Sequence, residues 1–191
     1  MTRLILVRHS LPAIDPAIPA PDWRLSDEGR RRAELLAQRL TGHGPGRTVS
    51  SPEPKALETA RIIHAQQADP VTIVPDLREQ ERRRGPHLTP QAFQEAVIAS
   101  LRHPDEVRFG EESAGAARQR FTAAIADQLA ATPPEQTLTV VTHGTVLALY
   151  VAAVTGVDAV DLWRRLGLPS YVTLTRPDLT LVDIVETIAA E

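Results

Sequence analysis

The sequence contains no cysteine, and neither sign of charge dominates its composition. The absence of cysteine excludes disulfides, thiolate chemistry, and cysteine-ligated zinc or iron–sulfur sites. With 21 Lys and Arg against 24 Asp and Glu, the formal net charge is −3. No whole-protein field therefore favours nucleic acid or an anionic membrane surface as a partner, and any attraction for anions must be local.

Long hydrophobic runs are also missing. The longest apolar stretch, Val146 to Val154, is about half the length that a membrane-spanning helix needs. Strand-like sequence begins directly after Met1-Thr2-Arg3, so we expect no targeting segment and a cytoplasmic location. A chain of 191 residues can bury one substantial core, and we expect a single domain over residues 1–191.

The chain is organised around a short apolar run, Leu4 to Val7, that ends in Arg8 and His9. Consecutive apolar residues of this kind predict a strand buried on both faces, as in a parallel sheet. At the carboxyl end of such a strand, side chains reach the crevice where α/β proteins bind ligands. Arginine beside histidine at that place indicates an anionic, phosphorylated ligand.

The rest of the chain alternates strand patterns with helix patterns. Ser26 is expected to cap the first helix, which Gly42 and Gly44 end. The other helices are expected to begin near Pro54, Pro90, Ser113, Thr145 and Val160, and the other strands to cover residues 48–50, 71–74, 138–142, 171–175 and 179–185. This order predicts a three-layer α/β/α fold, with a mostly parallel central sheet, helices on both faces, and the last strand as an antiparallel edge.

Two connecting segments are expected to surround the site. The proline-rich stretch from Leu11 to Trp23 has no periodicity and leaves the strand end beside His9, so we expect a loop that walls the site. A small helical insertion around residues 80–112 is expected to cover it. The Arg82-Arg83-Arg84 run in this insertion is typical of a solvated surface, although its position also suits a second anionic group of a substrate.

Polar groups suited to one reaction follow several of the predicted strands. They are Arg8 and His9, Ser50 and Ser51 with Lys55, Glu79 or Glu81, and His143. Because the carboxyl ends of parallel strands lie at one edge of the sheet, these groups are expected to converge. A neutral imidazole can attack phosphorus and hold the phosphoryl group, cations can stabilise its oxygens, and a carboxylic acid can protonate the leaving oxygen.

The motifs that carry these groups resemble the histidine phosphatase superfamily, which has the phosphoglycerate mutase-like fold. The matching stretches are Leu6-Val7-Arg8-His9, Leu25-Ser26-Asp27-Glu28-Gly29 with Ala33, Ser50-Ser51-Pro52 followed by Ala56, Glu58, Thr59 and Ala60, Gly110-Glu111-Glu112-Ser113, and Val141-Thr142-His143-Gly144. The resemblance implies that His9 is the nucleophile that becomes phosphohistidine. It also implies that Arg8 and His143 bind the phosphoryl group and that a glutamate after the third strand is the general acid.

The chain departs from this family pattern at two phosphate-binding positions. Ser10 follows His9 where the family usually has glycine, and it either adds a hydroxyl near the phosphate or changes the turn. Lys55 stands where the family's second phosphate-binding arginine is expected, and lysine keeps the charge but loses the bidentate fork. Arg61 is a poorer candidate for this role, because its spacing places it away from Lys55.

The general acid is expected to be Glu79, because Leu77-Arg78-Glu79 fits the family's Leu-x-Glu pattern. Glu81 lies two residues further on and is the alternative. The remaining histidines, at positions 43, 64, 87 and 103, have no comparable context and are expected at the surface. A metal site built from His9, His143 and either Asp15 or Glu79 lacks supporting spacing, so we expect no metal and no cofactor.

The sequence thus predicts a metal-independent phosphomonoesterase acting on a small phosphorylated substrate, with no nucleic acid or membrane partner. A phosphoglycerate mutase-type phosphotransferase is one alternative, but Ser10-Leu11-Pro12-Ala13 supplies none of the substrate-holding residues of that branch. A catalytically weak phospholigand-binding or regulatory module is the other, and Lys55 is the residue that favours it. The substrate and the oligomeric state stay open.

Overall fold

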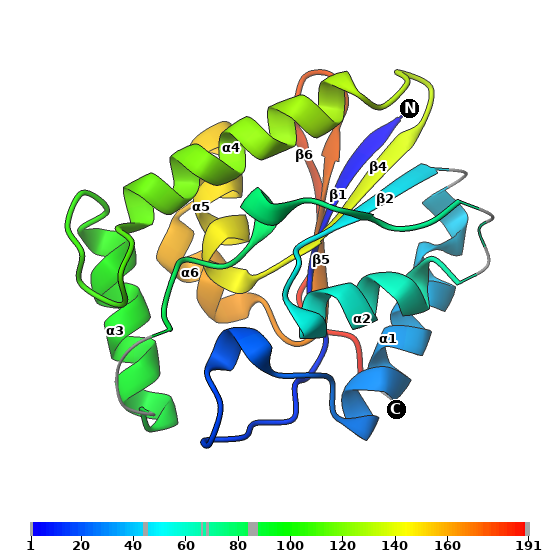
Figure 1. The fold of residues 1–191 in the computed structure, drawn as a ribbon. Coiled ribbons are helices and arrows are strands. Elements are labelled where there is room, and N and C mark those ends of the chain that lie inside the picture. Colours follow the sequence, from blue (N-terminus) through cyan, green and yellow to red (C-terminus); the bar gives the residue numbers. More distant parts are fainter. Residues whose placement is uncertain (1, 44–45, 66, 68, 84–87, 190–191) are drawn as a thin grey trace.

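The structure is a computed structural model that describes residues 2–43, 46–65, 67, 69–83 and 88–189. Its centre is a six-stranded sheet with the strand order β3-β2-β4-β1-β5-β6 (Figure 1). The strands are β1 (Arg3–Arg8), β2 (Gly46–Ser50), β3 (Thr72–Ile73), β4 (Thr137–Thr142), β5 (Ser170–Thr175) and β6 (Leu181–Val185). The pairs β1/β4, β2/β4 and β2/β3 are parallel, whereas β1/β5 and β5/β6 are antiparallel.

Helices cover both faces of the sheet, as Figure 1 shows. They are α1 (Asp27–Leu40), α2 (Pro54–Ile63), α3 (Pro90–Arg102), α4 (Ala114–Ala130), α5 (Gly144–Thr155) and α6 (Ala159–Arg165). The predicted three-layer α/β/α architecture is therefore confirmed. None of the helices in the described part of the chain is long and apolar enough to span a membrane.

Strand β1 is buried on both faces, as its sequence predicts, and its alternate side chains enter two different cores. Leu4 and Leu6 pack in a core with Phe121 of α4 and Leu147 of α5. Ile5 packs on the opposite face, in a core that includes Leu36 of α1. Because side chains alternate along a strand, an unbroken apolar run indicates that both faces of β1 are covered by other elements. Strand β1 therefore lies in the middle of the molecule.

The predicted start of α1 is confirmed. Ser26 accepts a hydrogen bond at Oγ from the Gly29 N–H, 2.9 Å away, and so satisfies one of the free donors of the first helical turn. The helix runs to Leu40 and continues as a 3₁₀ turn over Thr41–His43. Gly42 lies in this turn, whereas Gly44 lies outside the described residues.

Two strands differ from the sequence-based expectation. Strand β3 covers only Thr72–Ile73, because Pro75 opens a 3₁₀ turn directly after Val74. Strand β6 is the edge and pairs antiparallel to its neighbour, as predicted, but β5 is antiparallel to β1 as well. After α6 the chain has only a short connection before Ser170, which pairs with Arg8 at the carboxyl end of β1. A strand that enters the sheet at that edge must run against β1.

The segment that follows β1 is a loop, as predicted, apart from a 3₁₀ turn at Ala20–Asp22 and an antiparallel bridge between Pro12 and Leu25. It passes along the start of α2, where the Trp23 carbonyl accepts a hydrogen bond from the Lys55 N–H at 3.1 Å. The predicted insertion contains α3, while residues 84–87, including Arg84 and His87, lie outside the described residues. That the insertion covers the site stays a prediction.

Gly29 generates a stability prediction. A Cβ at this position would overlap the carbonyl oxygen of Leu11, which lies in the loop behind His9, whereas a Cβ at Gly42 would meet nothing within 4 Å. We expect Gly29→Ala to destabilise the fold by roughly 1–3 kcal/mol, as overpacking does, and Gly42→Ala to leave stability nearly unchanged. Thermal or urea unfolding of the two variants measures the difference. Equal midpoints for both would show that the loop moves aside at no cost.

Candidate active site

Two histidines meet where β1 and β4 end side by side. The two strands are parallel with Arg8 opposite Thr142, and the His9 N–H donates to the Thr142 carbonyl at 2.9 Å. The rings of His9 and His143 lie edge to face, with centroids 5.1 Å apart. Both residues are buried, with 7% and 1% of their surface exposed. The predicted convergence of these two residues is therefore present in the structure.

The ring of His9 is held in one orientation by the backbone. Its Nδ1 lies 2.7 Å from the carbonyl oxygen of Ser10, and because a carbonyl can only accept, Nδ1 carries the hydrogen. The lone pair is then on Nε2. Burial lowers the pKa of His9 well below its ordinary value, and His143 and Lys55 lower it further. His9 is thus a neutral imidazole at neutral pH with an unprotonated Nε2, which is the form that a nucleophile requires.

His143 occupies the position before the first residue of α5. Its Nε2 lies 2.8 Å from Ser51 Oγ, and its Nδ1 is buried with no hydrogen-bond partner. Burial lowers the pKa of His143 well below its ordinary value and Lys55 lowers it further, while Glu79 acts in the opposite direction. A buried polar atom without a partner is costly, so Nδ1 is a point where the site can take a further polar group.

The Arg8 guanidinium packs close to Gly144, the first residue of α5. A Cβ at Gly144 would stand 2.9 Å from both Cζ and Nε of the guanidinium, so the glycine after His143 makes room for this cation. The guanidinium donates to the Leu166 carbonyl, while its Nε is buried without a partner. Burial lowers the pKa of Arg8 to about 10, and the residue still carries its charge at neutral pH.

Lys55 acts electrostatically on both histidines, but its ammonium is not free. Nζ donates to Glu53 Oε2 at 2.6 Å and to the Ala20 carbonyl at 2.8 Å, and the residue is only 6% exposed. Its charge contributes to the lowered pKa of both His9 and His143. Arg61 is exposed on α2. The structure thus places Lys55 beside the two rings, while its role toward phosphate stays a prediction.

The two candidate acids lie in different surroundings. The Glu79 carboxylate accepts from the N–H groups of Thr145 and Val146 in the first turn of α5, at 3.1 and 3.3 Å. Burial raises the pKa of Glu79, but Arg82, His143 and the backbone N–H groups outweigh it, so the net shift is downward. Glu81 is exposed. Glu79 thus interacts electrostatically with His143.

Ser10 differs from the expectation of a hydroxyl near the phosphate. Its Oγ donates to the Gly29 carbonyl at 2.7 Å, its N–H donates to Thr59 Oγ1 at 3.0 Å, and the residue is fully buried. The hydroxyl therefore ties the turn after His9 to the first turn of α1. The alternative effect that the sequence left open, a change at the turn, agrees with these contacts.

Sequence reasoning missed Glu53, and it considered Arg82 only as a contact for a second anionic group of a substrate. The Arg82 guanidinium lies 3.0 Å from Glu79 Oε2 and 3.1 Å from Thr145 Oγ1. It also lies over the rings of Phe93 and Phe109, at 5.5 and 4.9 Å from their centroids. Its Nη1 is buried without a partner. Arg82 is therefore part of the site wall. The interpretation of the arginine run as a solvated surface was wrong for this residue, while a contact with a second anionic group of a substrate stays a prediction.

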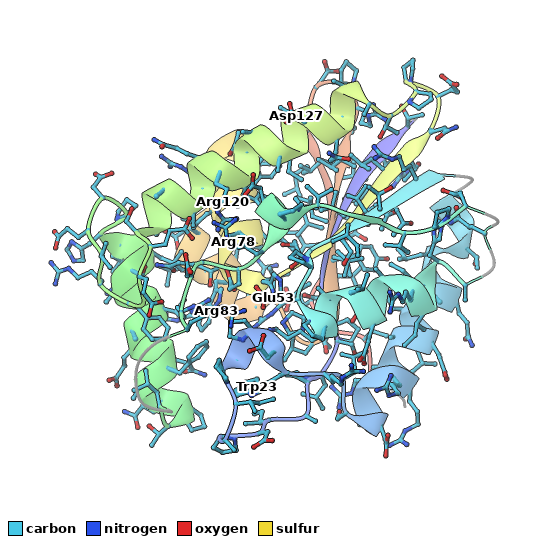
Figure 2. The ribbon with its side chains drawn as sticks, viewed as in Figure 1. Trp23, Glu53, Arg78, Arg83, Arg120 and Asp127 are labelled. Atoms are coloured by element: carbon cyan, nitrogen blue, oxygen red, sulfur yellow. The ribbon has the colours of Figure 1, made fainter. Side chains whose placement is uncertain are left out.

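The neighbouring Arg83 does lie at the surface, where its guanidinium pairs with both carboxylate oxygens of Asp22 at 3.2 and 3.3 Å. This ion pair joins the 78–83 segment to the loop after β1. Figure 2 labels Arg83, and it labels Glu53 at the start of α2 and Trp23 on the loop below it. A signal for Glu53 was present in the sequence, since it stands two residues before the expected cation.

The site combines three cations, two neutral histidines and two carboxylates. Arg8, Arg82 and His143 each keep one buried nitrogen without a hydrogen-bond partner in the structure. Over the described ranges, no three His, Cys, Asp or Glu side chains are grouped so that they could hold a metal ion. A tetrahedral oxyanion is the kind of ligand that can use several N–H donors approaching from different elements.

Comparisons with known proteins agree with this geometry. No curated protein matches the chain in sequence. A mycobacterial glucosyl-3-phosphoglycerate phosphatase solved with VO₃ is 22% identical, covers 100% of both chains and superposes with a TM-score of 0.76. An Entamoeba histolytica phosphoserine phosphatase variant solved with phosphoserine is 18% identical, covers 97% of both chains and has a TM-score of 0.71. These similarities show a shared fold, and the model of the histidine phosphatase superfamily (branch 1) matches residues 4–180. The chain therefore belongs to the histidine phosphatase superfamily, branch 1.

Proposed function

We propose that this protein is a phosphatase that hydrolyses a small phosphomonoester through a phosphohistidine on His9, without a metal ion. The observation that carries the proposal is the state of the His9 ring. Nδ1 is tied to the Ser10 carbonyl, and the ring is buried beside Arg8, Lys55 and His143. A neutral nucleophile surrounded by N–H donors and cations suits attack on a phosphorus atom whose oxygens carry negative charge.

The reaction follows from these positions in two steps. His9 Nε2 forms a bond to phosphorus while the bond from phosphorus to the ester oxygen breaks, and Glu79 gives its proton to the departing oxygen. Water then attacks the phosphohistidine, Glu79 takes a proton from it, and the N–P bond breaks to release inorganic phosphate. Arg8, Lys55 and His143 stabilise the phosphoryl oxygens in both steps.

Glu79 must hold a proton to act as the acid in the first step. In the free site its pKa is lowered despite burial, chiefly because Arg82 and His143 favour the carboxylate. A bound phosphoryl dianion adds negative charge among the same groups and therefore raises the pKa of the carboxyl group. Substrate binding thus prepares the protonated form that the leaving oxygen needs.

Two named structural relatives support the choice of a phosphatase. One is described as a glucosyl-3-phosphoglycerate phosphatase and the other as a phosphoserine phosphatase. Both names describe the removal of phosphate from a small phosphorylated molecule. We extend this class of reaction to the present chain, with the identity of its substrate left to a screen of phosphorylated metabolites.

The first prediction is a covalent intermediate. After rapid mixing with substrate and quenching, phosphate should be bound to the protein in an acid-labile, alkali-stable form, as expected for a phosphohistidine. His9→Ala should lose both this labelled phosphate and the activity, because no nucleophile remains. Phosphatase activity retained in His9→Ala, or activity that a chelator abolishes, would contradict the mechanism.

The second prediction separates the two glutamates. Protonation of the leaving oxygen matters for an alkyl phosphate and little for p-nitrophenyl phosphate, whose leaving group is already stable. Glu79→Gln should therefore slow the alkyl substrate by about 10²-fold or more and the aryl substrate much less. Glu81→Gln is the matched control and should be nearly neutral on both. A selective alkyl defect in Glu81→Gln instead would assign the acid to that residue.

The third prediction concerns pH and anion binding. The pKa of His143 is lowered in the free site and its Nδ1 has no partner, so a dianion bound beside it raises that pKa and binding takes up a proton. Sulfate, which does not itself titrate near neutral pH, should bind more tightly as the pH falls from about 8 to about 5. Calorimetry in buffers of different ionisation enthalpy measures the proton uptake, which should decrease in His143→Asn. Affinity that is independent of pH would refute this account.

A further inference from the structure

Glu53 is a buried carboxylate for which the proposed reaction has no role so far. It stands at the N-cap position of α2, yet its side chain makes no capping hydrogen bond. The side chain is 10% exposed. Burying a carboxylate costs several kcal/mol unless charges and hydrogen bonds compensate for the lost hydration. Its partners therefore show what this residue does.

The partners of Glu53 are three groups of the site. Oε2 lies 2.6 Å from Lys55 Nζ. Oε1 accepts from the Glu79 N–H at 2.9 Å and lies 3.4 Å from His143 Nε2. A single carboxylate thus contacts the cation at the arginine position, the backbone of the proposed acid, and the second histidine.

The contact with Glu53 orients the ammonium group of Lys55. Lysine is a flexible point charge, whereas the arginine expected at this position has a planar fork that orients itself against phosphate. Glu53 and the Ala20 carbonyl together hold two of the three ammonium donors. The remaining donor is then restricted to a narrow range of directions, so the Glu53–Lys55 pair substitutes for the geometric control of an arginine.

The contact with His143 selects a tautomer. Ser51 Oγ already accepts the Glu53 N–H at 3.2 Å and lies 2.8 Å from His143 Nε2. A carboxylate oxygen 3.4 Å from the same nitrogen can only accept, so it favours hydrogen on Nε2. When a phosphoryl oxygen reaches the unpartnered Nδ1, the ring must become an imidazolium to donate there. Glu53 stabilises that cation from the opposite side of the ring.

We propose that Glu53 is a positioning residue of this enzyme, which orients Lys55 and fixes His143 with its hydrogen on Nε2 and Nδ1 turned to the phosphoryl group. This inference rests on the proposed function for its kinetic consequence. Its consequence for the His143 tautomer concerns the ligand-free protein and can be measured without a substrate.

The chain provides a matched control for the loss of a carboxylate. Glu58 lies on the same helix, its side chain is 12% exposed, and it pairs at 3.1 Å with Arg24 and Arg30, whose side chains are exposed. Glu53→Gln keeps the side-chain oxygen that can accept the Glu79 N–H but removes the charge. Comparison of Glu53→Gln with Glu58→Gln therefore separates an effect on the site from the general cost of losing a largely buried, ion-paired carboxylate.

The kinetic experiment measures kcat and KM on a phosphomonoester for both variants. We expect Glu53→Gln to lower kcat/KM by about tenfold to a hundredfold, as misplacement of reacting groups does, while Glu58→Gln stays within about threefold of the parent. Adding Lys55→Arg to Glu53→Gln should recover part of the loss, because the guanidinium fork needs no carboxylate to orient it. A purely structural defect would show no such rescue.

The second measurement is the ¹⁵N spectrum of the imidazoles in the ligand-free protein, with His143 assigned by comparison with His143→Asn. We expect the His143 ring to carry its hydrogen on Nε2 in the parent and in Glu58→Gln. In Glu53→Gln we expect this preference for Nε2 to be lost. If the parent neither hydrolyses phosphomonoesters nor forms phosphohistidine, the proposed function fails while this spectrum still tests Glu53. If Glu53→Gln matches Glu58→Gln in both activity and tautomer, the role of Glu53 is refuted.

Discussion

The parallel pairing of β1 with β4 is the constraint on which the site depends. The register that places Arg8 opposite Thr142 also places the residues that follow them next to each other. His9 and His143 are far apart in the sequence. Their strands are nevertheless direct neighbours, and the His9 N–H donates a hydrogen bond to the Thr142 carbonyl. A change of one residue in this register would send one of the two rings to the opposite face of the sheet. The two buried cores on either side of β1 hold the register in place.

Burial and charge compete throughout the site. Removing Arg8, His9 and His143 from water lowers the pKa of each, so the imidazoles are neutral while the guanidinium remains charged. The carboxylates of Glu53 and Glu79 offset the cations through short contacts with Lys55 and Arg82. The site thus contains ion pairs together with unpartnered buried nitrogens of Arg8, Arg82 and His143. Under the proposed function, the oxygens of a bound phosphoryl group would be the partners of these nitrogens.

Much of the fold and part of the site could be predicted from local patterns. The apolar run of β1 predicts a central strand, Ser26 predicts a helix start, and the two strand-end histidines predict a common site, because each signal depends on residues close together in the sequence. Glu79 could be preferred over Glu81 only by resemblance to a family pattern. In the structure, Glu79 is distinguished by its contacts with α5, a helix that comes much later in the chain.

The features that were missed depend on long-range contacts. Arg82 is part of an arginine run, and its packing over Phe93 and Phe109, together with its hydrogen bond to Thr145, removes it from the surface. Ser10 donates its hydroxyl to Gly29 in the next helix, a contact that no local spacing indicates. The direction of β5 follows from where α6 ends. In each case the deciding partner lies on another element, so sequence periodicity contains no information about it.

The ion pair between Arg83 and Asp22 has a further consequence, for the response of the protein to ionic strength. Both side chains are about half exposed, at 53% and 47%, and such pairs contribute only about 0–1 kcal/mol and are screened by salt. The buried Glu53–Lys55 pair is shielded from mobile ions. Added salt therefore weakens the link between the two loops much more than it weakens the charge pair beside the histidines. Ionic strength acts mainly on the rim of this site.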